Sequence, residues 1–235
     1  MADEEPRADE VEAGQRVYTP FTLRVYDLIV LGFSNRFVWR CRSSKLLERY
    51  ESHVGARHLD VGVGTGWFLD HGRWPVENPQ ITLLDLNENS LSAASDRIRR
   101  YAPARVQANV LDPVDVGDAR FDSIGANFLF HCLPGELEWK ATTVASNLRP
   151  YLASGGVLFG STILGHGVAH NLLGRRLMRL YNRKGIFSNL EDNERGLEQG
   201  LASEQRYAAE KLDHGLSAKT VRNHIVLLEI GRAHV

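Results

Sequence analysis

The stretch HLDVGVGTGWFL, residues 58–69, decides the fold. It opens with a short apolar run that contains a β-branched residue, which predicts a buried strand. Gly62, Gly64 and Gly66 follow at alternate positions, and an apolar segment that can begin a helix comes next. Glycine permits a sharp turn and lets another group approach the backbone closely. The stretch therefore predicts a strand, a glycine loop and a helix that together bind a nucleotide-like ligand.

The glycine spacing selects among such ligands. The dinucleotide fingerprint G-x-G-x-x-G would place its third glycine at position 67, where the chain has Trp67. The pattern is instead D-x-G-x-G-x-G, and it begins with Asp60 at the end of the predicted strand. A carboxylate at that point would repel a pyrophosphate but can hold an ammonium group, directly or through water. A glycine-rich turn without a ligand is the alternative interpretation.

The D-x-G-x-G-x-G pattern resembles motif I of the class I S-adenosylmethionine-dependent methyltransferases. The resemblance covers about residues 55–165, in the order and spacing of the motifs. It implies an α/β, Rossmann-like methyltransferase fold with helices on both faces of a seven-stranded, mostly parallel sheet. The implied strand order is 3-2-1-4-5-7-6, with the last strand antiparallel. The implied cofactor is S-adenosyl-L-methionine, and the implied product is S-adenosyl-L-homocysteine.

The rest of the chain has the periodicity that such a fold requires. Strand and helix patterns alternate five times from residue 57 to 164, which predicts a parallel sheet with right-handed crossovers. Two later β-like runs, residues 205–212 and 220–230, match the terminal hairpin of the family.

Polar residues after the second and third strands fit the cofactor that the resemblance implies. Asp85 ends the second strand and can accept hydrogen bonds from the ribose hydroxyls, while Leu86 would pack on the adenine. Asn109 occupies the position where the family commonly has an Asp that binds the adenine amino group. Its amide oxygen can accept the same hydrogen bond. Asp112 is a competitor for this role, although its position before a proline favours a turn.

The end of the fourth strand faces the transferred methyl group in this fold. Asn127 or the backbone of Phe128 is expected to contact the methionine part. Metal-dependent catechol-type enzymes have an Asp ligand here, for which Asn127 is a poor substitute, so no metal is predicted. The predicted cofactor-binding residues are Asp60, Gly62, Gly64, Gly66, Asp85, Leu86, Asn109, Val110, Asn127 and Phe128.

Histidines after the fourth and fifth strands are candidates for a general base, because a neutral imidazole can take a proton near pH 7. His131 is the first candidate, with a capping or core-edge role as its alternative. His166 and His170 are the next candidates. Residues nearer the N-terminus that could line the pocket, or serve only packing and surface roles, are Tyr18, Tyr26, Trp39 and Arg40.

The composition fits one soluble α/β domain. The chain has 235 residues and a formal net charge of −1, so no overall field favours nucleic acid or an anionic membrane. No apolar run approaches the ~20 residues of a membrane helix. Two cysteines, Cys41 and Cys132, suit reduced thiols and a cytoplasmic location.

The expected domain organisation is simple. Residues 1–15 form a disordered acidic tail, and residues 16–230 form one methyltransferase domain. Within it, residues 16–54 form a helical cap and residues 165–204 a helical insertion on the substrate side. Residues 229–235 resemble a translated sequencing adapter, which suggests a non-native extension. A run of arginines in the insertion is expected to be a solvated helix face rather than a site for an acidic partner: Arg175, Arg176, Arg179 and Arg183.

These features together predict methyl transfer to an oxygen, nitrogen or sulfur acceptor on a small molecule, a specialised metabolite. The run HCLPG, residues 131–135, resembles the small-molecule branch of the family. The base-methylating motif Asn/Asp-Pro-Pro-aromatic is absent after the fourth strand, which counts against nucleic acid. A nucleic-acid or protein methyltransferase and a cofactor-binding protein without methyl transfer are the alternatives.

Overall fold

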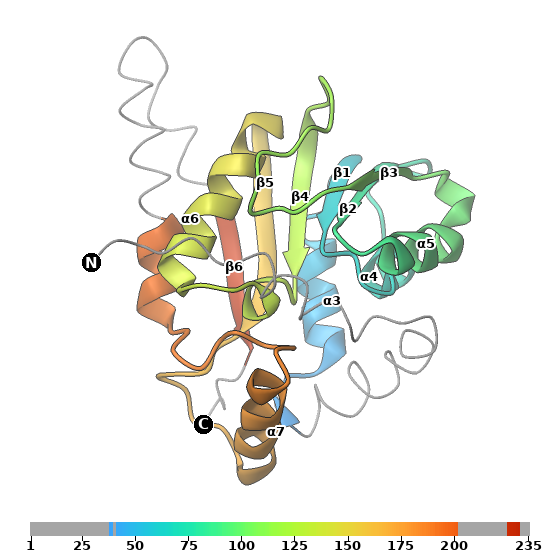
Figure 1. The fold of residues 1–235 in the computed structure, drawn as a ribbon. Helices are drawn as coiled ribbons and strands as arrows, with labels where there is room; N and C mark the ends of the chain where they lie inside the picture. The colour runs from blue at the N-terminus through green and yellow to red at the C-terminus, as the bar shows by residue number, and fades with distance from the viewer. Residues whose placement is uncertain (1–37, 40, 202–224, 231–235) are drawn as a thin grey trace, which may run out of the picture.

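The computed structural model describes residues 38–39, 41–201 and 225–230 (Figure 1). No helix of this described part is both long and apolar enough to cross a membrane. The elements are α3 (Ser43–Glu51), β1 (Arg57–Val61), α4 (Trp67–His71), β2 (Gln80–Asp85), α5 (Glu88–Arg97), η2 (Arg99–Tyr101), β3 (Ala104–Gln107), β4 (Phe121–Asn127), η3 (Phe130–Cys132), α6 (Leu137–Leu148), η4 (Arg149–Tyr151), β5 (Leu152–Ile163), α7 (Leu172–Arg183) and β6 (Ile225–Ile230).

The described strands form one sheet in the order β3-β2-β1-β4-β5-β6, and every neighbouring pair is parallel. The predicted order of the first five strands is confirmed. Chain order reverses between β1 and β4, which lie side by side although β2 and β3 come between them in the sequence. Such a switch point is where open α/β sheets bind their ligands, beyond the carboxyl ends of the strands.

The prediction for the end of the sheet is wrong in the described part. β6 lies beside β5, but the pairs Leu158–Ile225 and Ile163–Ile230 show that it runs parallel rather than antiparallel. Six strands are described instead of seven, and the run predicted as the sixth, residues 205–212, lies outside the described residues. An antiparallel last strand would follow from a tight hairpin. A strand parallel to β5 must begin at the same end of the sheet, and more residues separate Ile163 from Ile225 than the dozen or so that such a crossover needs.

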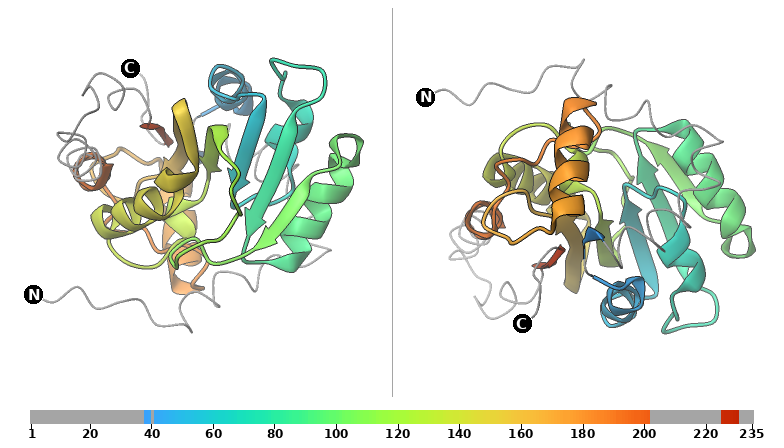
Figure 2. Two further views of the ribbon diagram at one scale, coloured as in Figure 1. Left: turned by 90° about the horizontal axis from the view of Figure 1, so that it is seen from above. Right: turned by 90° about the horizontal axis from the view of Figure 1, so that it is seen from below.

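Helices cover both faces of the sheet, because alternate strand residues point to opposite sides. Leu59 and Val61 belong to the core on the α6 side, whereas Ile81 and Leu83 pack with side chains from α3, α4 and α5. Figure 2 shows α3 and α6 on opposite sides of the sheet. The predicted two-faced arrangement is therefore confirmed.

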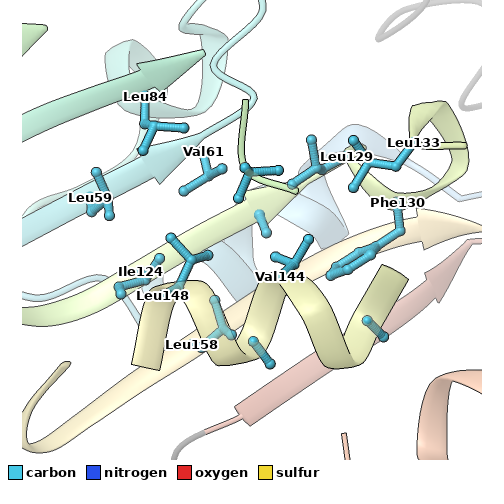
Figure 3. Packing of buried hydrophobic residues seen from close by; sticks show 14 of the residues in the cluster. Leu59, Val61, Leu84, Ile124, Leu129, Phe130, Leu133, Val144, Leu148 and Leu158 are labelled. Carbon is cyan, nitrogen blue, oxygen red and sulfur yellow. The ribbon is translucent and has the colours of Figure 1, made fainter. Parts of the chain in front are cut away.

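The hydrophobic core under α6 is the larger of the two (Figure 3). Val144 and Leu148 of α6 pack against Ile124 of β4 and Leu158 of β5, and all four are at most 1% exposed. Each such side chain contributes about 1.5–3 kcal/mol by leaving water. This packing holds β4 and β5 in place, and the end of β4 forms part of the site.

The segment after β5 is tied to the body of the protein by buried polar contacts. The Asn189 amide donates a hydrogen bond of 2.7 Å to the Ile163 carbonyl. The ammonium of Lys140, on α6, lies 2.8 Å from the Asp192 carboxylate, and these two side chains are 0% and 3% exposed. The predicted helical insertion contains α7 and further helical residues 194–201. In Figure 1, α7 lies at the end of the sheet to which the β4 arrow points.

Candidate cofactor site

One pocket opens at the carboxyl ends of β1, β2 and β4 and beside the residues that follow β3. The structure brings all the predicted cofactor-binding residues to its wall. They are Asp60, Gly62, Gly64, Gly66, Asp85, Leu86, Asn109, Val110, Asn127 and Phe128. They come from four separate segments of the chain, so the pocket depends on the switch point between β1 and β4.

The glycine loop has the backbone conformation that its residue type permits. Gly64 and Gly66 have φ values of 51° and 71°, in the left-handed region that residues with a Cβ rarely adopt. A Cβ on Gly66 would lie 3.0 Å from Cα of Ala94, so this glycine lets the loop pack on α5. A Cβ on Gly64 would meet no atom within 4 Å. The loop therefore offers an open stretch of backbone to a ligand.

Asp85 joins the end of β2 to this loop. Its carboxylate accepts a 2.8 Å hydrogen bond from the backbone N–H of Asn87. Burial raises the pKa of Asp85 to about 6, and the nearby Asp60 charge acts in the same direction. Hydrogen bonds from the backbone N–H groups of Asn87, Gly64 and Val63 lower the pKa and partly offset the burial. Asp85 is thus a carboxylate at neutral pH, placed to accept further hydrogen bonds.

Asp60, at the end of β1, is held by side chains for which the sequence analysis predicted no role. The Tyr50 hydroxyl donates a 3.0 Å hydrogen bond to Asp60 Oδ2, and His58 Nε2 lies 3.3 Å from the same oxygen. One signal was available in the sequence. His58 and Asp60 are two positions apart on a predicted strand, so they share a face.

The Asn109 side chain is fixed by its own turn. Its amide nitrogen donates to Asp112 at 2.9 Å, and its oxygen accepts from the Leu111 N–H at 3.1 Å. An amide oxygen has two lone pairs, so Asn109 Oδ1 can still accept one hydrogen bond from a ligand. Asp112 is exposed and is not among the residues that line the pocket. Its contact with Asn109 fits the turn role that the following proline favours.

Asn127 has a buried donor without a partner at the end of β4. Its Oδ1 accepts a 3.1 Å hydrogen bond from the Ser161 hydroxyl, whereas Nδ2 has no partner among the described residues. Buried amide donors are normally paired, so this one is available to a ligand in the pocket.

Phe128, the next residue, has a φ of 59°, which is uncommon for a residue with a bulky side chain. Its N–H donates to the Ser161 carbonyl at 2.7 Å, which fixes this conformation. Its ring stacks on Phe68, with centroids 6.3 Å apart and planes at 23°. Strained backbone of this kind concentrates at functional sites.

The structure does not bring His131 to the pocket wall. Its side chain is 3% exposed, and its Nδ1 accepts from the Ile163 N–H at 3.4 Å. Its ring meets Phe187 edge to face, with centroids 4.5 Å apart. Burial, together with the charge of Lys140, lowers the pKa of His131 to about 3. At neutral pH the imidazole is therefore uncharged and a weak base.

The other predicted pocket residues lie elsewhere or outside the described part. His166 is exposed, and His170 Nε2 bonds to the Leu164 carbonyl at 2.7 Å. Trp39 is buried in a cluster that includes Ile163 and Met178. Tyr18, Tyr26 and Arg40 lie outside the described residues.

Several lining residues were not predicted from the sequence. They make the wall near Asn127 mainly apolar, and they are Phe68, Leu129, Cys132, Leu133 and Pro134. Within the described residues, no group of three or more His, Cys, Asp and Glu side chains is arranged to hold a metal ion.

Comparison with known proteins gives the same assignment as the site. A methyltransferase-domain family model matches residues 59–158. The demethylluteothin O-methyltransferase of Streptomyces thioluteus is 40% identical over 196 residues, which cover 82% of this chain and 84% of the relative. A physcion biosynthesis cluster O-methyltransferase of Aspergillus chevalieri is 36% identical over 190 residues, with 80% and 85% covered.

The fold is shared more widely than the sequence. The cyclopropane synthase MmaA2 of Mycobacterium tuberculosis has a TM-score of 0.58 and 15% identity, over 90% of this chain and 82% of that one. At this identity the likeness concerns the fold alone.

The chain therefore belongs to the class I S-adenosylmethionine-dependent methyltransferases, in the branch that acts on small molecules. It is an enzyme that transfers a methyl group from S-adenosyl-L-methionine to a specialised metabolite.

Proposed function

We propose that this enzyme methylates a hydroxyl oxygen of a small, largely apolar metabolite. One observation carries the proposal: ten residues predicted for the cofactor line one pocket, in a chain 40% identical to a relative named as an O-methyltransferase. The apolar wall near Asn127 supports an acceptor with little charge, because that wall has no cation or carboxylate to pair with a charged group.

The residues present fit S-adenosyl-L-methionine. When bound, the cofactor supplies a methyl group on a sulfonium centre. The Asp85 carboxylate is suited to accept hydrogen bonds from the ribose hydroxyls, and Asn109 Oδ1 to accept one from the adenine amino group. Leu86 and Val110 offer apolar contact to the base. The open backbone at Gly64 leaves room for the sugar and the sulfur.

The two ends of the amino-acid part have matching partners. The Asp60 carboxylate suits the ammonium group, directly or through water, and the unpartnered Asn127 Nδ2 suits the carboxylate. A pyrophosphate at Asp60 would be disfavoured, because two anions would then meet in a buried site.

The protein's contribution to the reaction is chiefly positioning. Phe68, Phe128 and Leu129 form an apolar surface beside Asn127 that can align the acceptor oxygen and exclude water. Alignment of this kind can supply up to ~7–11 kcal/mol of the barrier reduction. The proposal takes residues 16–230 as one domain, with the cap (residues 16–54) and the insertion (residues 165–204) on the acceptor side.

Two further assignments complete the proposal. The reaction needs no metal ion, because an amide rather than a carboxylate follows β4 at Asn127. The location is cytoplasmic, in keeping with two free cysteines, Cys41 and Cys132.

The role of His131 as general base stays a prediction, and His131→Asn tests it. A base is supported if the variant loses turnover while it keeps its affinity for S-adenosyl-L-homocysteine and its melting temperature. A packing role, which burial and the low pKa favour, is supported if the variant loses melting temperature and keeps turnover.

The function itself is tested by calorimetry and product mass. We expect the protein to bind S-adenosyl-L-homocysteine and Asp85→Ala to abolish this binding. With S-adenosyl-L-methionine and matched panels of phenols, amines and thiols, we expect a mass gain of one methylene unit on phenols. A folded protein that does not bind the product would overturn the proposal, and so would preferential methylation of amines, thiols, transfer RNA or peptides.

A further inference from the structure

A chain of buried polar side chains runs along the α3 face of the sheet and ends at the pocket. His58 and Asp60 of β1 lie opposite Ser123 and Gly125 of β4 in the strand register. His58 is 0% exposed and Tyr50, on α3, is 1% exposed. Asp60 is 6% exposed and is the only one of these five residues that lines the pocket.

Four close contacts connect this chain. The Gly55 N–H donates to Ser123 Oγ at 2.7 Å, and Ser123 Oγ lies 2.8 Å from His58 Nδ1. His58 Nε2 lies 2.9 Å from the Tyr50 hydroxyl, which donates to Asp60 Oδ2 at 3.0 Å.

The proton count sets the direction of each bond. The Tyr50 hydroxyl has one proton and gives it to Asp60, so it accepts from Nε2–H of His58. In a neutral imidazole Nδ1 is then the acceptor, and the Ser123 hydroxyl donates to it. Every donor therefore points along the chain towards the carboxylate of Asp60. Bonds aligned in this way polarise and strengthen one another in a low-dielectric interior.

The absence of a side chain at Gly125 makes room for the His58 ring and the Asp60 carboxylate. A Cβ on Gly125 would lie 3.1 Å from Cε1 of His58 and 3.3 Å from Asp60 Oδ2. Burial and the Asp60 charge raise the pKa of Tyr50 well above its ordinary value, so the hydroxyl keeps its proton. A strand buried for packing alone would have an apolar residue at 58, since burying polar groups is costly.

We propose that Tyr50 and His58 are positioning residues, which occupy Oδ2 of Asp60 and leave its other oxygen for the cofactor's ammonium group. This inference rests on the proposed function, because it assigns Asp60 to that end of the cofactor. It predicts that this row of buried polar side chains strengthens binding of the amino-acid end of the cofactor and does not change binding of the nucleoside end.

The test compares two ligands with the variant Tyr50→Phe, which keeps the ring and removes the hydroxyl. S-adenosyl-L-homocysteine has the amino-acid end, and 5′-methylthioadenosine lacks it. The bond from Tyr50 to Asp60 lies within the protein, so its loss acts on binding only through the position of Asp60. A coupling of about 1 kcal/mol between such neighbours predicts about fivefold weaker binding of S-adenosyl-L-homocysteine. Binding of 5′-methylthioadenosine stays within about twofold. Equal weakening of both ligands would overturn the proposal, because a general structural defect acts on both.

A double-mutant cycle provides the second readout. If Tyr50 acts through Asp60, then Tyr50→Phe has no further effect on binding of S-adenosyl-L-homocysteine in the Asp60→Asn background. Independent, additive losses would contradict the proposal. Replacing His58 by Gln supplies a third member of the cycle, with the same expectation, should Tyr50→Phe fold poorly.

Tyr151→Phe is the matched control. It removes a tyrosine hydroxyl that donates to the Val114 carbonyl, and neither residue lines the pocket. We expect it to lower the melting temperature and leave the affinity ratio of the two ligands unchanged. Failure of the wild-type protein to bind either ligand would count against the proposed function. Binding with an unchanged ratio in Tyr50→Phe would count against the positioning role alone.

Discussion

The backbone N–H of Gly64 lies close enough to the carboxylate of Asp85 to lower its pKa. The acid that ends β2 and the glycine loop that follows β1 are therefore one structural unit. A change in either is expected to alter the conformation of the other.

The first prediction concerns pH. The pKa of Asp85 is raised to about 6 by burial, so the side chain loses its charge as the pH falls through that value. A protonated carboxyl accepts ribose hydroxyls less well, and affinity for S-adenosyl-L-homocysteine should fall below about pH 6. Titration calorimetry between pH 5 and 8 measures this, with Asp85→Asn as the variant in which the dependence is weaker. A wild-type affinity that is flat across this range would contradict the assignment.

The contribution of Asp85 to folding stability changes with pH in the opposite direction to its contribution to binding. A carboxyl whose folded pKa lies above its unfolded value of 3.8 favours the folded state most at low pH. That contribution is lost as the pH rises from about 4 to about 6. As the pH rises through this interval, the wild-type protein should therefore lose unfolding free energy relative to Asp85→Asn. Denaturant titration of both proteins at several pH values measures this difference.

The second prediction compares two glycines with nearly the same backbone. Gly66 has a φ of 71° and Gly117 a φ of 70°, so alanine costs about 1–2 kcal/mol at either position. A Cβ at Gly66 also meets Ala94 at 3.0 Å, whereas a Cβ at Gly117 meets no atom within 4 Å. We expect Gly66→Ala to weaken product binding by at least about tenfold, since the loop must move. Gly117→Ala should lower stability alone, and similar binding losses in both variants would refute this account.

The third prediction concerns the buried ion pair of Lys140 and Asp192. Their charged groups lie 2.8 Å apart, but Asp192 Oδ2 accepts no well-aligned hydrogen bond from the described residues. Burial lowers the pKa of Lys140 and raises that of Asp192 to about 6. Lys140→Met leaves a buried carboxylate uncompensated and should cost about 3–5 kcal/mol in unfolding free energy.

The double variant Lys140→Met with Asp192→Leu is the control for that prediction. Apolar side chains of similar size remove both charges, so most of the lost stability should return. A single variant as stable as the wild-type protein would show that the pair does not anchor the insertion.

The fourth prediction concerns metal removal. Dialysis against EDTA should leave the rate of methyl transfer unchanged, because neither cofactor nor acceptor is proposed to bind a cation. Addition of magnesium or zinc after dialysis should have no effect either. Loss of activity on chelation, with recovery on addition of one metal, would refute this part of the proposal.

The residues that the sequence analysis expected at the cofactor lie together in one pocket, for a physical reason. Gly64, Gly66 and Asp85 are required by local geometry, since a positive φ and a carboxylate at a strand end show directly in residue type and spacing. The parallel direction of the first five strands follows from the alternation of strand and helix patterns, whereas their order was implied by the family resemblance. These are short-range requirements, and short-range patterns are legible in a single sequence.

The parts that were missed depend on contacts between distant residues. Tyr50 reaches Asp60 from a helix on the α3 face, and no spacing rule relates the two. The surroundings of His131 also depend on tertiary contacts, with Lys140 on α6 and with Phe187 after α7, and its role as a base stays a prediction. The direction of β6 depends on the end of the sheet from which the chain enters this strand, which local periodicity does not encode.

The pocket wall has one further consequence. Each lining residue lies between Asp60 and Pro134, before the chain enters α6. The segment that follows β5 adds α7 near the same end of the sheet without supplying any of that wall. The residues proposed to hold the cofactor are thus encoded in one continuous stretch of the gene, from Asp60 to Phe128. Exchange of the segment after β5 for that of a relative should therefore leave the affinity for the methyl donor intact.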